Sequence, residues 1–134
     1  MKDRVLLPMV VGVMIGLVGL GANAQVVAIT HPSVTLTAED LRDVFLGEKQ
    51  LAGSTKLVPV DNASAQDLFL AKVVKLDVTK YTNAWTKKSF RDGLTPPAIK
   101  ATDAEVIDFV KRTSGAVGYV NSAPSAGVNI IALP

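Results

Sequence analysis

The stretch LVPVDNASAQDLFLAKVV, residues 57–74, changes character in its middle. It opens with an apolar run as far as Val60 and then passes through the small polar residues 61–64. From there apolar residues recur at intervals of three and four, the period of an amphipathic helix. The stretch predicts a strand over 56–60, a tight turn and a helix over 64–76. Because a helix N-terminus offers free N–H groups and partial positive charge, this junction is either a plain helix cap or an anion site.

Cap and turn signals on both sides predict the remaining elements. Thr37 with Asp40, and Thr102 with Glu105, have the spacing of a capping box. Aromatic residues four apart indicate a further helix over 77–88, with Thr79 as its expected cap. The patterns together predict strands over 25–30, 116–121 and 128–133. They predict helices over 38–46, over 77–88 and from 102 to before Gly115. A polar turn is expected over 48–55, and irregular chain over 91–100, where Gly93 precedes a double proline.

The first 24 residues have the pattern of a secretory signal peptide. Lys2 and Arg4 form a basic start, and the apolar run that follows is about 16 residues, short for a membrane span of about 20. Ala22-Asn23-Ala24 supplies the small residues that signal peptidase accepts. We therefore predict cleavage before Gln25 and a periplasmic or secreted protein.

The remaining 110 residues, 25–134, predict a single domain. The chain has no cysteine, which excludes disulfides, a thiolate nucleophile and a cysteine-based metal site. Without Lys2, Asp3 and Arg4, the balance is 12 basic to 11 acidic residues. Such an even balance argues against nucleic acid as a partner.

The order of elements predicts an α/β layered fold, with strands 25–30 and 56–60 parallel and joined by a right-handed crossover. In such sheets ligands bind beyond the carboxyl ends of the strands. Two polar turns are expected there, at one shared edge of the sheet. The candidate ligand-binding residues are Thr30, His31, Ser33, Asp61, Asn62, Ser64 and Ala65.

Four segments in order resemble the phosphate-binding proteins of ABC transporters, and specifically their small single-lobe relatives. These segments are LRDVFLGEK (41–49), VPVDNASAQDLFLAKV (58–73), Trp85 and Phe90 with a glycine and prolines after them, and EVIDFVKRTSGAVGYV (105–120). The resemblance implies a three-layer αβα fold, one lobe of a type II periplasmic binding protein, with a mixed and mostly parallel sheet. It also implies a small phosphate-like oxyanion as ligand, held by helix N-termini and by Ser, Thr and Arg side chains.

The sequence departs from this family at the expected phosphate turn. The family has an Arg followed by a Gly-Ser-Gly-Thr run, whereas this chain has DNASAQD, residues 61–67. Asp61 lies near the position of the Arg, and Ser64 alone is placed to keep a hydroxyl role. A carboxylate 4 Å from a bound anion would repel it by about 1–4 kcal/mol. The junction therefore fits a plain helix cap about as well as an anion site.

Other residues offer little chemistry. His31 is the only histidine, and no partner spacing gives it an acid–base role, so an exposed turn histidine is the plainer interpretation. A metal site and a bound cofactor are not expected, and no nucleophile–base pair indicates an enzyme. Tyr81 and Trp85 are interpreted as core residues in preference to a ligand platform.

Two functions remain open on the sequence. The first is an exported solute-binding module for phosphate or a related oxyanion, with the membrane components of an ABC transporter or a second copy of the chain as partners. The second is an accessory interaction module of the cell envelope that keeps the fold without the ligand.

Overall fold

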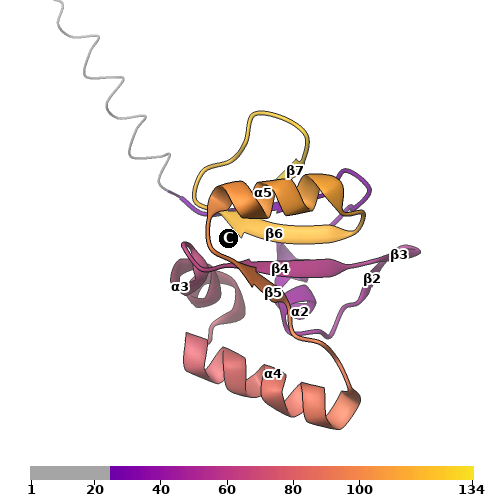
Figure 1. The fold of residues 1–134 in the computed structure, drawn as a ribbon, viewed down its shortest axis with the longest axis vertical. Coiled ribbons are helices and arrows are strands. Elements are labelled where there is room, and N and C mark those ends of the chain that lie inside the picture. Colours follow the sequence, from indigo (N-terminus) through magenta and orange to yellow (C-terminus); the bar gives the residue numbers. More distant parts are fainter. Residues whose placement is uncertain (1–24) are drawn as a thin grey trace, which may run out of the picture.

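The computed structural model describes residues 25–134 (Figure 1). The predicted signal peptide lies outside the described residues. Five strands form the main sheet in the order β5-β4-β6-β1-β7, and β2 and β3 form a separate ribbon. The strands are β1 (Val27–Thr30), β2 (Leu51–Ala52), β3 (Thr55–Lys56), β4 (Val58–Asn62), β5 (Ala98–Lys100), β6 (Ala116–Val120) and β7 (Asn129–Ala132).

The main sheet is mixed and mostly parallel. Strand β4 pairs in parallel with both β5 and β6, whereas β1 runs antiparallel to β6 and β7. The predicted α/β class and sheet type are confirmed. The predicted parallel crossover from β1 to β4 is wrong, because β1 runs in the opposite direction and β6 lies between them. Strands that follow each other in the chain are usually neighbours, but here β6, buried along its whole length, takes the place between them.

The helices lie close to their predicted positions. They are α2 (Leu41–Phe45), preceded by the 3-10 turn η2 (Ala38–Asp40), α3 (Gln66–Phe69), which continues into the π-helical η3 (Leu70–Val74), α4 (Val78–Asp92) and α5 (Asp103–Arg112). The segment predicted as a helix over 64–76 is thus helical over 66–74. It ends early because the Lys75 N–H bonds to the Leu70 carbonyl, 2.7 Å away, and Lys75 adopts a left-handed conformation with φ 64°.

The region from residue 77 to residue 100 differs from the prediction in two ways. Asp77, not Thr79, caps α4, and its carboxylate accepts the Lys80 N–H at 2.8 Å. The chain predicted to be irregular over 91–100 begins as the last turn of α4 and ends as strand β5. Because β5 has three residues and follows the double proline, it carries no period that a sequence pattern could show.

Helices cover both faces of the sheet and make three layers (Figure 1). Along β6, Val117 and Tyr119 join the core beneath α2, α3 and η3, while Ala116 and Val120 join the smaller core beneath α5. Side chains of a strand alternate between its two faces, and β6 is buried on both. Gly118 lets α5 approach closely, since a Cβ there would lie 2.7 Å from the Val106 side chain.

Three aromatic rings form the centre of the larger core. The ring of Phe69 stacks on that of Tyr119 with centroids 3.8 Å apart, and Phe45 meets both rings edge-on at 4.8 and 5.6 Å. All three side chains are fully buried. The helix that carries Phe69 is therefore fixed to the sheet directly after the turn at residues 61–65.

Helix α4 is held by two aromatic anchors. Tyr81 and Trp85 are the buried residues of this 15-residue helix. The Trp85 indole N–H donates to the Phe45 carbonyl at 2.9 Å, and the ring lies against Gly47 at the end of α2. Gly47 has φ 75°, which suits glycine, and a Cβ there would lie 2.7 Å from the indole.

This contact predicts a difference between two glycine substitutions. Gly53→Ala has open space around the new Cβ but a left-handed φ of 63°, and we expect a loss of about 1 kcal/mol of unfolding free energy. Gly47→Ala has the same backbone strain and also overpacks Trp85, so we expect about 1–3 kcal/mol more. Urea unfolding followed by tryptophan fluorescence measures both, and equal losses for the two variants would contradict the Trp85 contact.

Candidate functional site

The two polar turns expected at one edge lie at opposite edges of the sheet. Thr30, at the carboxyl end of β1, pairs with Val117 near the start of β6. Asn62, at the carboxyl end of β4, donates to the Tyr119 carbonyl near the end of β6. The prediction that the two turns share one edge is therefore wrong, because β1 runs in the direction opposite to the one predicted.

The first turn is bound up in local contacts. His31 Nδ1 lies 2.7 Å from Ser33 Oγ and accepts the Ser33 N–H at 3.0 Å. Ser33 Oγ also accepts the Gly115 N–H at 3.2 Å. Thr30 is buried, and its hydroxyl donates to the Val34 carbonyl at 3.4 Å. These bonds tie the end of β1 to the start of β6, as in an ordinary structural turn.

Asn62 organises the second turn. Its fully buried amide donates to Asp103 Oδ1 at 2.8 Å and to the Tyr119 carbonyl at 2.9 Å. Its side-chain oxygen accepts from both the N–H and the hydroxyl of Ser64, at 3.0 and 2.7 Å. The Ala65 N–H donates to the Asn62 carbonyl at 3.0 Å. The Ser64 hydroxyl proton is thus used within the turn.

Asp103, the first residue of α5, also belongs to this turn, although no local sequence pattern pointed to it. Its carboxylate lies 3.4 Å from Ser64 Oγ and accepts the backbone N–H groups of Asn121 and Ser122 at 3.0 and 3.2 Å. Burial opposes ionisation, but the hydrogen bonds from Asn62, Asn121 and Ser122 outweigh it and lower the pKa of Asp103. A fixed negative charge therefore lies beside the start of α3.

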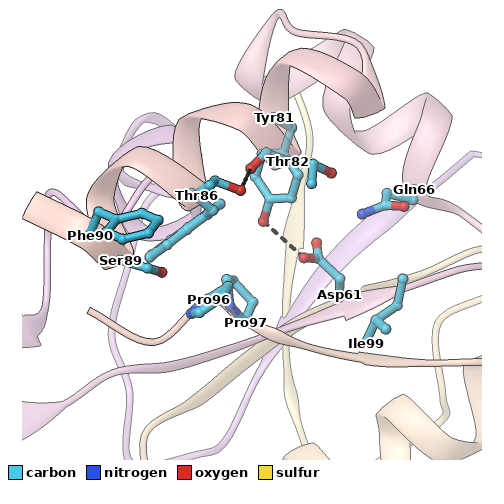
Figure 2. A pocket seen from close by; sticks show the side chains of 11 residues that line it. Asp61, Gln66, Tyr81, Thr82, Thr86, Ser89, Phe90, Pro96, Pro97 and Ile99 are labelled. Carbon is cyan, nitrogen blue, oxygen red and sulfur yellow. Dashed lines mark hydrogen bonds between the residues drawn. The ribbon is translucent and has the colours of Figure 1, made fainter. Parts of the chain in front are cut away.

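Asp61 is buried between two tyrosines. Tyr119 donates its hydroxyl to Oδ1 at 2.7 Å. Tyr81 donates its hydroxyl to Oδ2 at 2.8 Å (Figure 2). The side chain is 3% exposed, and within residues 25–134 no Lys or Arg forms an ion pair with it. Burial raises the pKa of Asp61 to about 6, although the two tyrosine bonds oppose the shift.

A cleft of about 370 Å³ opens beside Asp61. Helix α4 forms one wall, to which Trp85 contributes. Tyr81 and Phe90 lie on this wall, and Pro96, Pro97 and Ile99 lie across from them (Figure 2). The Phe90 side chain is 89% exposed. Of the candidate residues from the sequence, Asp61 alone lines this cleft. Tyr81 and Trp85 are buried, as predicted. Both also border the cleft, so each is a core residue and part of the cleft wall.

Metal-binding clusters and membrane-spanning helices are absent from the described residues. Within residues 25–134, His, Cys, Asp and Glu side chains do not gather in threes that could hold a metal ion. In the same part of the chain, no helix has the length and apolar character needed to cross a membrane.

The fold is similar to that of PstS from Borrelia burgdorferi. The superposition has a TM-score of 0.56 at 19% identity and covers 81% of this chain and 46% of PstS. An ABC-type phosphate transport receptor from Vibrio cholerae gives a TM-score of 0.47 at 16% identity, with 79% of this chain and 44% of the receptor covered. No family model and no curated protein matches the sequence. The described residues thus share the fold of part of PstS, and the chain spans under half the length of that protein.

The environment of Asp61 predicts a specific pH dependence of stability. The pKa of Asp61 is raised from 3.8 to about 6 in the folded protein. Its contribution to the free energy of unfolding is therefore fully present below pH 3.8 and is lost as the pH rises through 6. The loss is on the order of 2–3 kcal/mol. In Asp61→Asn this loss is absent, so the variant should gain stability relative to the natural protein between pH 4 and pH 7.

Urea unfolding at both pH values measures this double difference. Other carboxylates titrate equally in the two proteins and cancel. If the unfolding free energies of the natural protein and of Asp61→Asn differ by the same amount at pH 4 and at pH 7, the raised pKa of Asp61 is contradicted.

Proposed function

We propose that this chain is an exported solute-binding module that binds a small molecule in the cleft beside Asp61. The observation that carries the proposal is a buried carboxylate, without an ion pair among the described residues, on the wall of a cleft of about 370 Å³. Ligand cavities typically measure about 300–1,000 Å³ and combine apolar walls with a few polar groups. The likeness to PstS supports a binding role over a catalytic one. The apolar leader over 1–24 supports a periplasmic or secreted location.

Phosphate or a related small oxyanion is the ligand that the family resemblance implies, bound at the start of α3. The first-turn N–H groups of a helix favour such a ligand. Two contacts weigh against this site. The Ser64 hydroxyl already donates its hydrogen bond to Asn62 Oδ1, and the Asp103 carboxylate lies 3.4 Å from Ser64 Oγ. An anion bound there would be repelled by about 1–4 kcal/mol for each unit charge at 4 Å. The cleft beside Asp61 is therefore the favoured site.

The membrane components of an ABC transporter, or a second copy of the chain, are the partners that this role calls for. The chain covers 46% of the length of PstS. A cleft formed by one lobe stays open on one side, and a partner surface would close it.

An interaction module without a solute is the second candidate. Phe90 is 89% exposed and Ile99 56% exposed, and both border the cleft. Exposed large apolar side chains that gather in one place mark contact surfaces between proteins. A partner protein that covered these two residues would also fill the cleft.

A thermal-shift screen of small solutes with the purified protein separates these functions. A solute at 100 times its dissociation constant should stabilise the protein by about 2.7 kcal/mol, which for this size raises the melting temperature by about ten degrees or more. We expect at least one solute to do so, and we expect millimolar phosphate and sulfate to leave the temperature unchanged.

Ser64→Ala is the control for the oxyanion site. A phosphate-induced shift that disappears in this variant would return the ligand to the start of α3. If no solute raises the melting temperature while the protein forms a stable complex through Phe90 and Ile99, the interaction module is the correct function.

A further inference from the structure

The charge of the cleft beside Asp61 selects the kind of solute that it can hold. Among the described residues that line it, Asp61 carries the only charge. The basic residues of α4 are Lys80, Lys87, Lys88 and Arg91, and among the described residues none of them forms an ion pair with Asp61. Lys88 pairs with Glu48 at 3.7 Å, and Arg91 pairs with Asp92 at 3.0 Å.

The Asp61 carboxylate keeps capacity for a further partner. A carboxylate has about four acceptor positions, two on each oxygen. Tyr119 uses one position on Oδ1, and Tyr81 uses one on Oδ2. Both tyrosines donate, and neither brings a positive charge. An ionised carboxylate buried in this way is costly unless a cation balances it.

The opposite wall of the cleft suits a cation that carries alkyl groups. Tyr81, Trp85 and Phe90 line it from one helix (Figure 2). Aromatic faces attract cations electrostatically, most strongly for Trp and for cations out of water, and such walls recognise quaternary ammonium groups. A small inorganic cation would leave these apolar surfaces without contact.

We propose that the cleft beside Asp61 binds a small organic ammonium ion, whose charge is balanced by Asp61 and whose alkyl groups contact Trp85 and Phe90. The inference rests on the proposed solute-binding role and adds the chemical class of the solute. The ligand must be small enough for a cleft of about 370 Å³.

Binding of such an ion requires ionised Asp61. The titratable groups that face this carboxylate are Tyr81 from α4 and Tyr119 from β6, and burial next to Asp61 raises the pKa of both hydroxyls, which keeps them protonated as donors. Because the pKa of Asp61 is about 6, a cation should bind about tenfold more weakly at pH 5 than at pH 7.5.

Trp85 provides the readout. It is the only tryptophan of the chain and borders the cleft, so its fluorescence should change when the cleft fills. Choline is the probe, titrated into the purified protein at constant ionic strength. The control ligand is the uncharged alcohol in which carbon replaces the choline nitrogen. We expect saturable binding of choline and at least tenfold weaker binding of the alcohol.

Two pairs of variants locate the site. Asp61→Asn should weaken choline binding at least tenfold, whereas Asp67→Asn, which removes an exposed carboxylate from α3, should leave it unchanged. Phe90→Ala should weaken binding about three- to tenfold, whereas Leu51→Ala, which removes an exposed side chain from β2, should have no effect.

The proposal is overturned if choline does not bind, if the alcohol binds equally well, or if binding is indifferent to Asp61→Asn in a folded variant. Should Asp61→Asn fail to fold, the Phe90 variant and the pH titration decide, and binding that is equally strong at pH 5 overturns it. Another solute that stabilises the protein while choline does not would reject the ammonium ligand and leave the solute-binding role intact.

Discussion

The carboxylate of Asp61 joins three parts of the fold. It belongs to β4 and accepts one hydroxyl from Tyr119 of β6 and one from Tyr81 of α4. Helix α4 buries only Tyr81 and Trp85, and each has one directed hydrogen bond to the rest of the protein. The position of α4, and with it one wall of the cleft, therefore depends on two buried hydrogen bonds, one of which is made to Asp61. A hydrogen bond buried in this way is stronger than one in water, and its loss costs more.

The sequence predicted the individual elements well because their signals are local. The caps at Thr37 and Thr102 act within one turn, and an apolar period shows in any short window. The pairing of strands is different in kind. That β1 lies between β6 and β7 depends on contacts about 90 to 100 residues apart in the chain, and no local pattern carries the direction of β1. Strand β5 and the β2–β3 ribbon were missed altogether: they lie where irregular chain and a polar turn were predicted, because strands of two or three residues carry no period. The wrongly placed cap of α4 is a small error of boundary.

The site could be predicted only in part from the sequence, for the same reason. Asp61 and Asn62 end strand β4, and Ser64 lies between β4 and α3, so the strand-to-helix junction in the sequence pointed to them. Their roles depend on residues from elsewhere: Asp103 lies 41 positions beyond Asn62, and Tyr119 lies 58 beyond Asp61. Spacing within a motif identifies the turn, but the charges brought to it by other elements decide its chemistry.

The two carboxylates at this edge show how that decision is made. Asp103 accepts hydrogen bonds from two backbone N–H groups and two side-chain amides, which lower its pKa and satisfy its charge within the protein. Asp61 accepts two hydroxyl groups, and burial raises its pKa. One charge is therefore structural, and the other is left without compensation on the wall of a cleft. In this chain the edge beyond β4 is therefore negatively charged, and Asp61 is the carboxylate there that no cation balances among the described residues.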